Sequence, residues 1–314
     1  MSVKGKLLLD VGGTFIKAGL AVGEDNLLPD SYFKVPIDSA GSSEKIISAL
    51  LSALSLGRAD AESAGVEIVG IGVCIPGPFD YDKGVPLMKH KFASIYGLDL
   101  RNEILKSGFS GVSVTFMHDV AAMLSGEMTY GSGASYKNVA IVTLGTGLGF
   151  AFSQNRQIRL SSSKSPAVPI YNLPYKDGIL EDYASKRGFL RIYSEISHSS
   201  FASHFPESHF AAADGSLTVA DIGKAASLGD NAALQTFSTV GAILASALRE
   251  ILREKRIECL LFGGQISKSF AFMEPAITTG LSELTDSGLL THIGKATHID
   301  DAAFYGLCKR LNTL

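Results

Sequence analysis

The chain has 314 residues, of which 46% are hydrophobic and 19% charged, so it can form one large or two medium-sized folded domains and is not a disordered chain. The net charge is −3 and no block of lysine or arginine occurs, which argues against nucleic acid as a partner. The 33 glycines gather largely in short clusters, which indicates binding turns built from backbone rather than a flexible linker.

The three cysteines, Cys74, Cys259 and Cys308, are far apart in the sequence. Their spacing indicates neither a disulfide framework nor a cysteine zinc site, and is typical of buried thiols in a reducing compartment. The first residues have no signal-peptide pattern, and no run of about 18 apolar residues occurs. We therefore expect a cytoplasmic protein that does not enter a membrane.

Residues 5–22 are predicted to form a hairpin, because two apolar runs flank a short Gly12-Gly13-Thr14 corner. Glycines there would allow positive φ and a close approach to another group. Backbone N–H groups, the Thr14 hydroxyl and Lys17 can hold a phosphate. Asp10 beside them would repel that anion unless a divalent cation lay between, so the hairpin indicates a metal–nucleotide site. An ordinary glycine turn is the alternative.

The next elements are read from apolar periodicity and breakers. A helix is predicted to begin at Ser42 or Ser43. The continuous apolar run over 68–75 predicts a strand buried on both faces, which ends at Pro76-Gly77-Pro78. His118-Asp119 then opens a predicted helix over 120–128, and residues 138–144 form another predicted strand.

A second glycine corner, Gly145-Thr146-Gly147, follows that strand. It is not a dinucleotide-binding fingerprint, because Phe150 stands where the last glycine is needed and the next residues alternate as a strand. Two such hairpins suggest a duplicated fold that grips phosphate between its halves. Later segments predict helices over 218–226, 231–255 and 300–311, and a strand over 257–262 that ends in Gly263-Gly264.

Four of these motifs, taken together and in order, resemble the ROK family of sugar kinases in the actin/hexokinase/Hsp70 superfamily. They are Asp10-Val-Gly-Gly-Thr14, Gly72-Val-Cys-Ile-Pro-Gly-Pro-Phe-Asp80, His118-Asp119 before an alanine-rich helix, and Leu144-Gly-Thr-Gly-Leu-Gly149. The Gly263-Gly264 pair and the segment Gly178-Ile-Leu-Glu181 also fall at the family's positions.

The resemblance implies an α/β fold of two RNase H-like lobes, with ATP, Mg²⁺ and a sugar in a central cleft. The first lobe would hold residues 1–116 and 300–314, with the first phosphate hairpin and the sugar side. The second would hold residues 117–299, with the second phosphate hairpin and the adenosine site. The implied reaction transfers the γ-phosphoryl group of ATP to a hydroxyl, usually C6, of a hexose or N-acetylhexosamine. Homodimers are common in the family.

The implied residue roles follow the motifs one by one. Asp119 would be the catalytic base, and Asp10 would lie near magnesium, through water. ATP and its phosphates would be bound by Asp10, Gly12, Gly13, Thr14, Lys17, Gly145, Thr146, Gly147, Gly263 and Gly264. The sugar would be bound by Gly77, His90, His118, Asp119 and Glu181.

Two features depart from the family pattern. His118 replaces the usual asparagine before the catalytic aspartate, which touches the sugar, so sugar specificity would differ. The family's zinc site needs a His and a Cys-x-Cys-Gly-x-x-Gly-Cys run, but the stretch from Val168 to Ile179 contains neither Cys nor His. No zinc is therefore expected, and we expect Tyr171, Asn172 and Pro174 to hold this loop by packing and hydrogen bonds.

Several alternatives stay open at this point. A carboxylate placed in line with the γ-phosphate can accept a hydroxyl proton, but Asp119 is also a good helix N-cap, and one carboxylate cannot easily do both. A DNA-binding regulator, which the family also contains, would carry a basic helix pair before the first hairpin, and none is present. A non-catalytic sugar or nucleotide sensor is the remaining alternative to a kinase.

Overall fold

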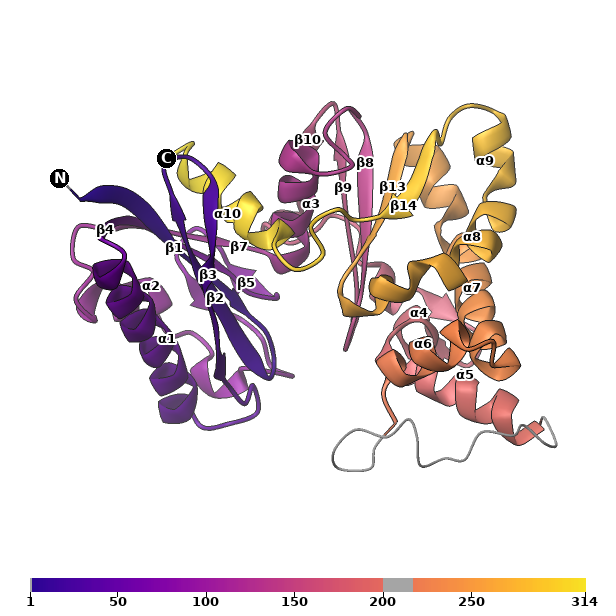
Figure 1. Ribbon diagram of the computed structural model, residues 1–314, viewed down its shortest axis with the longest axis horizontal. Helices are drawn as coiled ribbons and strands as arrows, with labels where there is room; N and C mark the ends of the chain where they lie inside the picture. Colours follow the sequence, from indigo (N-terminus) through magenta and orange to yellow (C-terminus); the bar gives the residue numbers. More distant parts are fainter. Residues whose placement is uncertain (1, 200–216) are drawn as a thin grey trace. The chain divides into compact units, whose positions relative to one another are not determined.

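A computed structural model describes residues 2–199 and 217–314 of the chain (Figure 1). Contacts divide it into two compact units. Unit 1 comprises Met1–Ala134, Ile158–Ala167 and Asp301–Leu314, and unit 2 comprises Ser135–Gln157 and Val168–Asp300. The helix that follows His118 thus packs in unit 1, whereas the sequence-based boundary at residue 116 assigned it to the second lobe.

Unit 1 is built on a five-stranded sheet with the order β3-β2-β1-β4-β7. Strands β1, β4 and β7 are parallel, β2 is antiparallel to β1, and β3 at the edge of the sheet is antiparallel to β2. The predicted first hairpin is therefore confirmed as β1 and β2. The bounds are β1 (Val3–Val11), β2 (Phe15–Val22), β3 (Asn26–Pro36), β4 (Val66–Cys74) and β7 (Ser113–Met117).

Both faces of strand β1 are buried, and its side chains alternate between them. Leu7 and Leu9 join a core with α1 (Ser43–Ser63), whereas Leu8 joins a second core with α10 (Ala302–Leu311) and α3 (Asp119–Tyr130). Figure 1 shows α1 on one side of this sheet and α3 with α10 on the other. Asp10 follows the same alternation, so it lies on the α10 face at the end of the strand.

Helices α3 and α10 cross at unusually close range, and glycine makes this possible. A Cβ atom on Gly126 would lie 2.0 Å from the carbonyl oxygen of Ala302, and one on Gly306 would lie 2.0 Å from that of Ala122. This crossing fixes the first turn of α3 beside the strand ends. The smaller elements of unit 1 are β5 (Phe79–Asp80), β6 (Val85–Pro86), η1 (Ala93–Ile95) and α2 (Leu100–Lys106).

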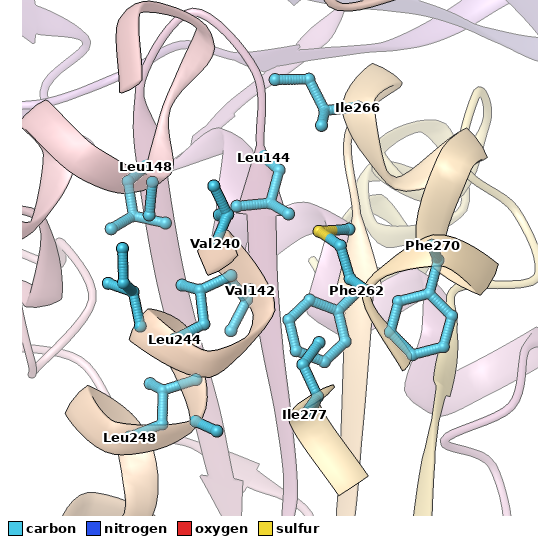
Figure 2. Packing of buried hydrophobic residues seen from close by; sticks show 14 of the residues in the cluster. Val142, Leu144, Leu148, Val240, Leu244, Leu248, Phe262, Ile266, Phe270 and Ile277 are labelled. Carbon is cyan, nitrogen blue, oxygen red and sulfur yellow. The ribbon is translucent and has the colours of Figure 1, made fainter. Parts of the chain in front are cut away.

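Unit 2 is built on a sheet with the order β10-β9-β8-β13-β14, in which β8, β13 and β14 are parallel. Figure 2 shows the apolar face of α7 (Asn231–Lys255), with Val240, Leu244 and Leu248, packed near the side chains of Val142 and Phe262. Burying one such leucine contributes roughly 1.5–3 kcal/mol. The strands are β8 (Val139–Leu144), β9 (Leu148–Gln154), β10 (Gln157–Ile158), β13 (Cys259–Gly263) and β14 (His292–Lys295).

The remaining elements of unit 2 surround this core. They are η2 (Ile170–Asn172), β11 (Pro174–Tyr175), β12 (Gly178–Ile179), α4 (Leu180–Ala184), α5 (Lys186–Ser199), α6 (Val219–Ser227), η4 (Gln265–Phe272), α8 (Glu274–Gly280) and α9 (Ser282–Asp286). Among the described helices of either unit, none has the length and apolar character needed to cross a membrane.

Candidate functional site

In unit 1, the carboxyl ends of three parallel strands bring the predicted catalytic residues to one sheet edge. Asp10 of β1 is the register partner of Cys74 of β4, and Cys74 is the partner of Met117, the last residue of β7. The Cys74 thiol donates a hydrogen bond of 3.3 Å to Oδ1 of Asp10. Such an edge is where open α/β sheets place their ligands, so Asp10 and the residues after Met117 lie together as one candidate site.

His118 and Asp119 form a close pair at the start of α3. Nδ1 of His118 lies 2.7 Å from Oδ1 of Asp119, and the Val120 N–H donates to the same oxygen at 2.8 Å. A proton must lie between two atoms as close as the first pair, so Nδ1 donates to the carboxylate. Both contacts are to Oδ1, and no described residue donates a hydrogen bond to Oδ2 of Asp119. Oδ2 is therefore left to accept a proton from a ligand.

This geometry divides the helix contact and the base between the two oxygens of Asp119. His118 occupies the N-cap position and Asp119 is the first helical residue, but the Val120 N–H bonds to Oδ1 of Asp119, and Oδ2 is left for a proton. Burial raises the pKa of Asp119, but the charge and hydrogen bond of His118, the Val120 N–H and the charge of Lys91 outweigh it, and the pKa is lowered overall. Asp119 is therefore ionised at neutral pH, as a general base must be.

Asp10 has the opposite electrostatic environment. Burial and the neighbouring charge of Asp119 raise its pKa to about 6, although the Cys74 thiol and the charge of Lys17 lower it. Two carboxylates that repel each other at a strand edge offer hard oxygen ligands and a negative field. This donor set fits a magnesium ion, which Asp10 would hold through water.

The first glycine corner offers two backbone N–H groups to an anion. The Gly12 N–H bonds to the carbonyl of Phe15 at 2.9 Å, but the N–H groups of Gly13 and Thr14 have no hydrogen-bond acceptor within the described part of the chain. Two adjacent unpaired amides form a concave anion site. The expected positive φ is wrong for this corner: neither Gly12 nor Gly13 has it. A Cβ atom on Gly13 would contact only Ser39, so glycine here keeps the corner open.

Lys17, predicted to bind phosphate, has another partner in the structure. Its ammonium group lies 3.1 Å from Oδ1 of Asp301, just before α10, and above the rings of Tyr32 and Phe304. Because its register partner is Asp10, it points to the α10 face of the sheet. The ion pair with Asp301 provides a structural role for this lysine within unit 1.

The predicted sugar residues of unit 1 differ in their positions. Gly77 is close to His118, because a Cβ atom on it would lie 3.5 Å from Cδ2 of that ring and 3.2 Å from the Tyr81 hydroxyl. His90 is exposed. The adjacent Lys91 is partly buried, and its charge acts on Asp119. Within this loop, Lys91 is therefore the residue whose charge acts on the Asp119 carboxylate.

The second glycine corner, in unit 2, repeats the features of the first. It joins β8 to β9, and the Gly145 N–H bonds to the carbonyl of Gly147 at 3.1 Å. The N–H groups of Thr146 and Gly147 have no acceptor among the residues described, and a Cβ atom on Gly145 would meet nothing within 4 Å. This corner too can receive an anion through adjacent amides.

Glu181 lies against the second corner. Its Oε2 accepts a hydrogen bond of 2.9 Å from the Leu148 N–H, and a Cβ atom on Gly147 would lie 2.8 Å from the same oxygen. Arg187 approaches its other oxygen at 3.3 Å. The predicted sugar ligand thus has a visible function within unit 2, which is to hold the corner.

Gly263 and Gly264 stand at the end of β13, next to β8. Gly264 has a φ of +81°, and a Cβ atom there would lie 2.4 Å from the carbonyl oxygen of Leu144. Only glycine fits, so the strand-to-helix turn needs it on steric grounds. The pair therefore lies close to the second corner.

A pocket of about 580 Å³ opens beside this corner, within the usual size range for small-molecule sites. Its wall combines backbone groups, apolar side chains, hydroxyls and three lysines. The lining residues are Gly145, Thr146, Lys186, Thr218, Val219, Ala220, Gly223, Lys224, Ser227, Gln265, Ile266, Lys268 and Ser269. Lysines and hydroxyls suit phosphates, and the Val219, Ala220 and Ile266 surfaces suit a planar base.

The loop without cysteine or histidine is held by a short β-ladder and by aromatic packing. Tyr171, Asn172 and Pro174 are exposed, so their side chains are not buried there, but Pro174 does pair with Ile179 between β11 and β12. The rings of Tyr175 and Tyr183 meet edge to face at 4.8 Å, and the Leu180 N–H donates to Leu173 at 2.8 Å. The described residues contain no group of three or more His, Cys, Asp or Glu side chains arranged for a metal.

The sequence profile of the ROK family matches residues 7–163, half of the chain. The chain belongs to the ROK family. It is 30% identical over 198 residues to a glucokinase of Streptomyces coelicolor, covering 58% of this chain and 57% of that one. It is 26% identical over 278 residues to a glucokinase of Halalkalibacterium halodurans, covering 83% and 80%. The chain thus spans little more than half the length of the first curated relative.

Solved glucokinase structures share the fold at low identity. A glucokinase from Parabacteroides distasonis has a TM-score of 0.76 at 19% identity, covering 100% of this chain and 99% of that one. A ROK glucokinase from Streptomyces griseus, solved with glucose and AMPPNP, has a TM-score of 0.73 at 21% identity, covering 98% of both. These likenesses establish the actin-like ATPase fold predicted from the sequence.

Several residues at this ROK site were not found from the sequence. Cys74 was read only as a buried thiol, although its place in the register beside Asp10 follows from the parallel pairing of β1 and β4. Lys186 and Lys224 enter the pocket from α5 and α6, which are separate in the sequence. No local motif marks them, because their proximity to Gly145 arises only from tertiary packing.

Proposed function

We propose that this ROK protein is an ATP-dependent sugar kinase that transfers the γ-phosphoryl group of ATP to a hydroxyl, at C6, of a hexose or N-acetylhexosamine. The observation that carries the proposal is the ionised Asp119 carboxylate, whose Oδ2 is uncommitted, at the strand edge that also holds Asp10. The glucokinases among its relatives support a sugar as the acceptor.

In this proposal, Asp119 accepts the proton of the sugar hydroxyl as the oxygen attacks the γ-phosphorus. His118 and the Val120 N–H hold Oδ1, so the other oxygen is directed to the acceptor. A fixed carboxylate avoids the cost of orienting a base during the reaction. Gly77 lets the chain pass close to the side chains of Ser165 and His118, so it would act on the sugar site through the placement of His118.

The phosphates would be held largely by backbone. The unpaired amides of Gly13 and Thr14, and those of Thr146 and Gly147, each suit phosphate oxygens. The lysine-lined pocket beside Gly264 would take the nucleoside part of ATP. Asp10 would hold Mg²⁺, which when bound neutralises charge on the β- and γ-phosphates.

A coupled ADP-release assay over a panel of hexoses and N-acetylhexosamines tests the proposal and identifies the substrate. Asp119→Asn should lower turnover by several orders of magnitude while calorimetry finds ATP binding close to wild type. Sugar and nucleotide binding without any turnover would instead support a non-catalytic sensor. Near-normal turnover by Asp119→Asn would remove the proposed base. We also propose a homodimer, which light scattering after gel filtration would measure.

A further inference from the structure

We propose that Lys91 is a catalytic residue, whose ammonium group contacts the phosphoryl group during its transfer and neutralises its charge. The inference rests on the proposed kinase function and adds a residue that no motif identified. It depends on three observations in unit 1: the anchoring of the loop, its connection to the first glycine corner, and the lack of a protein partner for Lys91.

The loop that carries Lys91 is held firmly at both ends. Met88 and Phe92, on either side of the basic tripeptide 89–91, are completely buried. The Phe92 N–H donates to the carbonyl of Ser39 at 2.6 Å, and the Leu87 N–H donates to that of Pro78 at 3.0 Å. Lys91 is therefore presented from a fixed backbone, which a catalytic cation needs.

The same hydrogen bonds connect this loop to the phosphate corner. Ser39, the acceptor for Phe92, donates its own N–H to the carbonyl of Gly13 at 3.1 Å. A Cβ atom on Gly13 would also lie 3.4 Å from the hydroxyl oxygen of Ser39. Lys91 thus directly precedes Phe92, whose backbone is linked through Ser39 to Gly13, the first of the two residues with an unpaired amide. Its charge also acts on Asp119, so it lies within electrostatic range of the base.

Lys91 is the lysine of this region that stays available to a ligand. Lys17 is paired with Asp301, and Lys89 lies over the ring of Tyr96. In the ranges 2–199 and 217–314, Lys91 makes no hydrogen bond or ion pair, although it is partly buried. A partly buried ammonium group without a partner is costly, and a phosphoryl oxygen would satisfy it.

The charges at the strand edge explain why such a cation is needed. Asp10 and Asp119 are both carboxylates, and the triphosphate brings further negative charge to the same edge. In the transfer, the bond from the acceptor oxygen to the γ-phosphorus forms while its bond to ADP breaks, and the hydroxyl proton passes to Asp119. Lys91 keeps its protons throughout and balances the charge on the equatorial oxygens.

The test compares Lys91→Met and Lys91→Arg with Lys89→Met, a matched change two residues away on the same loop. We expect Lys91→Met to lower kcat roughly 10²- to 10³-fold, with the sugar KM and the dissociation constant of AMPPNP within about threefold of wild type. Lys91→Arg should recover part of kcat, and Lys89→Met should be near wild type. Equal thermal midpoints would show that the variants fold.

Three results would overturn the inference: a kcat of Lys91→Met near wild type, a loss confined to the sugar KM, or an equal loss of kcat in Lys89→Met. A loss in KM alone would make Lys91 an acceptor-binding residue. If the wild-type chain itself turns over no sugar, the proposed function fails and the role of Lys91 fails with it. Wild-type turnover with an active Lys91→Met variant rejects the role of Lys91 alone.

Discussion

Oε2 of Glu181 accepts a hydrogen bond from the backbone N–H of Leu148 at 2.9 Å, which attaches the start of α4 to the corner between β8 and β9. The same oxygen faces Gly147, where no larger residue would fit without displacing it. The carboxylate therefore shapes the backbone that presents the amides of Thr146 and Gly147. This relationship links a segment expected to bind sugar with the expected phosphate corner.

Replacing Glu181 distinguishes these two roles. Glu181→Ala removes the acceptor for Leu148 and should raise the KM for ATP about tenfold or more, whereas Glu181→Gln keeps an oxygen acceptor and should have a much smaller effect. Steady-state kinetics with ATP and sugar varied separately would measure both. A rise confined to the sugar KM in both variants would restore Glu181 to the sugar site and reject the supporting role.

Without bound magnesium or nucleotide, ionised Asp10 should lower the stability of the folded protein at neutral pH. Its pKa is raised from 3.8 to about 6, so the folded protein binds this proton more tightly than the unfolded chain does. The contribution of Asp10 to the free energy of unfolding therefore falls as the pH rises from about 4 to 6 and stays low above that range.

Asp10→Asn should remove this segment of the pH dependence. At pH 7, without magnesium or nucleotide, the variant should be about 1–3 kcal/mol more stable than wild type while it loses turnover. Chemical denaturation at pH 4.5 and pH 7 is the measurement. Cys74→Ala is a useful comparison, because loss of the thiol donor should raise the pKa of Asp10 further. An Asp10→Asn variant that is less stable at pH 7 would contradict this account.

His118 should set the acid limb of activity through Asp119. Its charge and hydrogen bond are the main factors that lower the pKa of that carboxyl, so His118→Ala should raise it toward the ordinary value. Activity in the variant should then decline at a higher pH than in wild type as the pH is lowered. Loss of the His118 hydrogen bond to Asp119 should also cost about 1 kcal/mol of stability.

The pH profile of kcat/KM checks this prediction for both proteins. His118→Asn is the matched control, because asparagine is a good N-cap and can still donate to Asp119. It should regain the lost stability and part of the pH shift. An unchanged acid limb in His118→Ala would mean that His118 does not control the protonation of Asp119.

The fold was predictable because the apolar patterns of this chain are strong and its glycine corners are close to strand ends. Runs such as residues 68–75 and 138–144 predict strands, which are largely buried in the structure apart from Val69, and the corners at Gly12 and Gly145 predict the two hairpins. The division into units was harder to predict from the sequence. It depends on whether α3 packs against α10, and these two helices are far apart in the sequence. That contact requires glycine at positions 126 and 306, which no local pattern reveals.

The positions of candidate site residues could be predicted where a strand or helix end defines them, as for Asp10 and Asp119. They were not predictable where long side chains choose among partners. Lys17 and Lys91 carry the same side chain, but they differ in their partners. Lys17 forms an ion pair with Asp301, whereas no residue in the described chain forms one with Lys91. His90 and Lys91 are neighbours, but the path of the loop gives only the latter a link to Asp119.

Gly264 and Gly229 allow the conformational and steric costs of a side chain to be separated. Both have positive φ, at +81° and +85°, so alanine at either position should bring backbone strain of about 1–3 kcal/mol, and the strain should be high at Gly264, whose ψ of 166° lies in a region that only glycine readily adopts. At Gly229 nothing lies within 4 Å of the added Cβ atom. At Gly264 the Cβ atom would lie 2.4 Å from the carbonyl oxygen of Leu144, so β13 and β8 must separate.

We therefore expect Gly264→Ala to lower the thermal midpoint much more than Gly229→Ala does. Its total cost in the free energy of unfolding should be several kcal/mol, because a displaced strand end also weakens core packing. Since the shift reaches Leu144, next to Gly145, ATP binding should also weaken in Gly264→Ala and remain unchanged in Gly229→Ala. Calorimetry with AMPPNP and thermal unfolding measure the two effects. Equal melting of the two variants would mean that the strand ends relax without cost and that Gly264 serves backbone conformation alone.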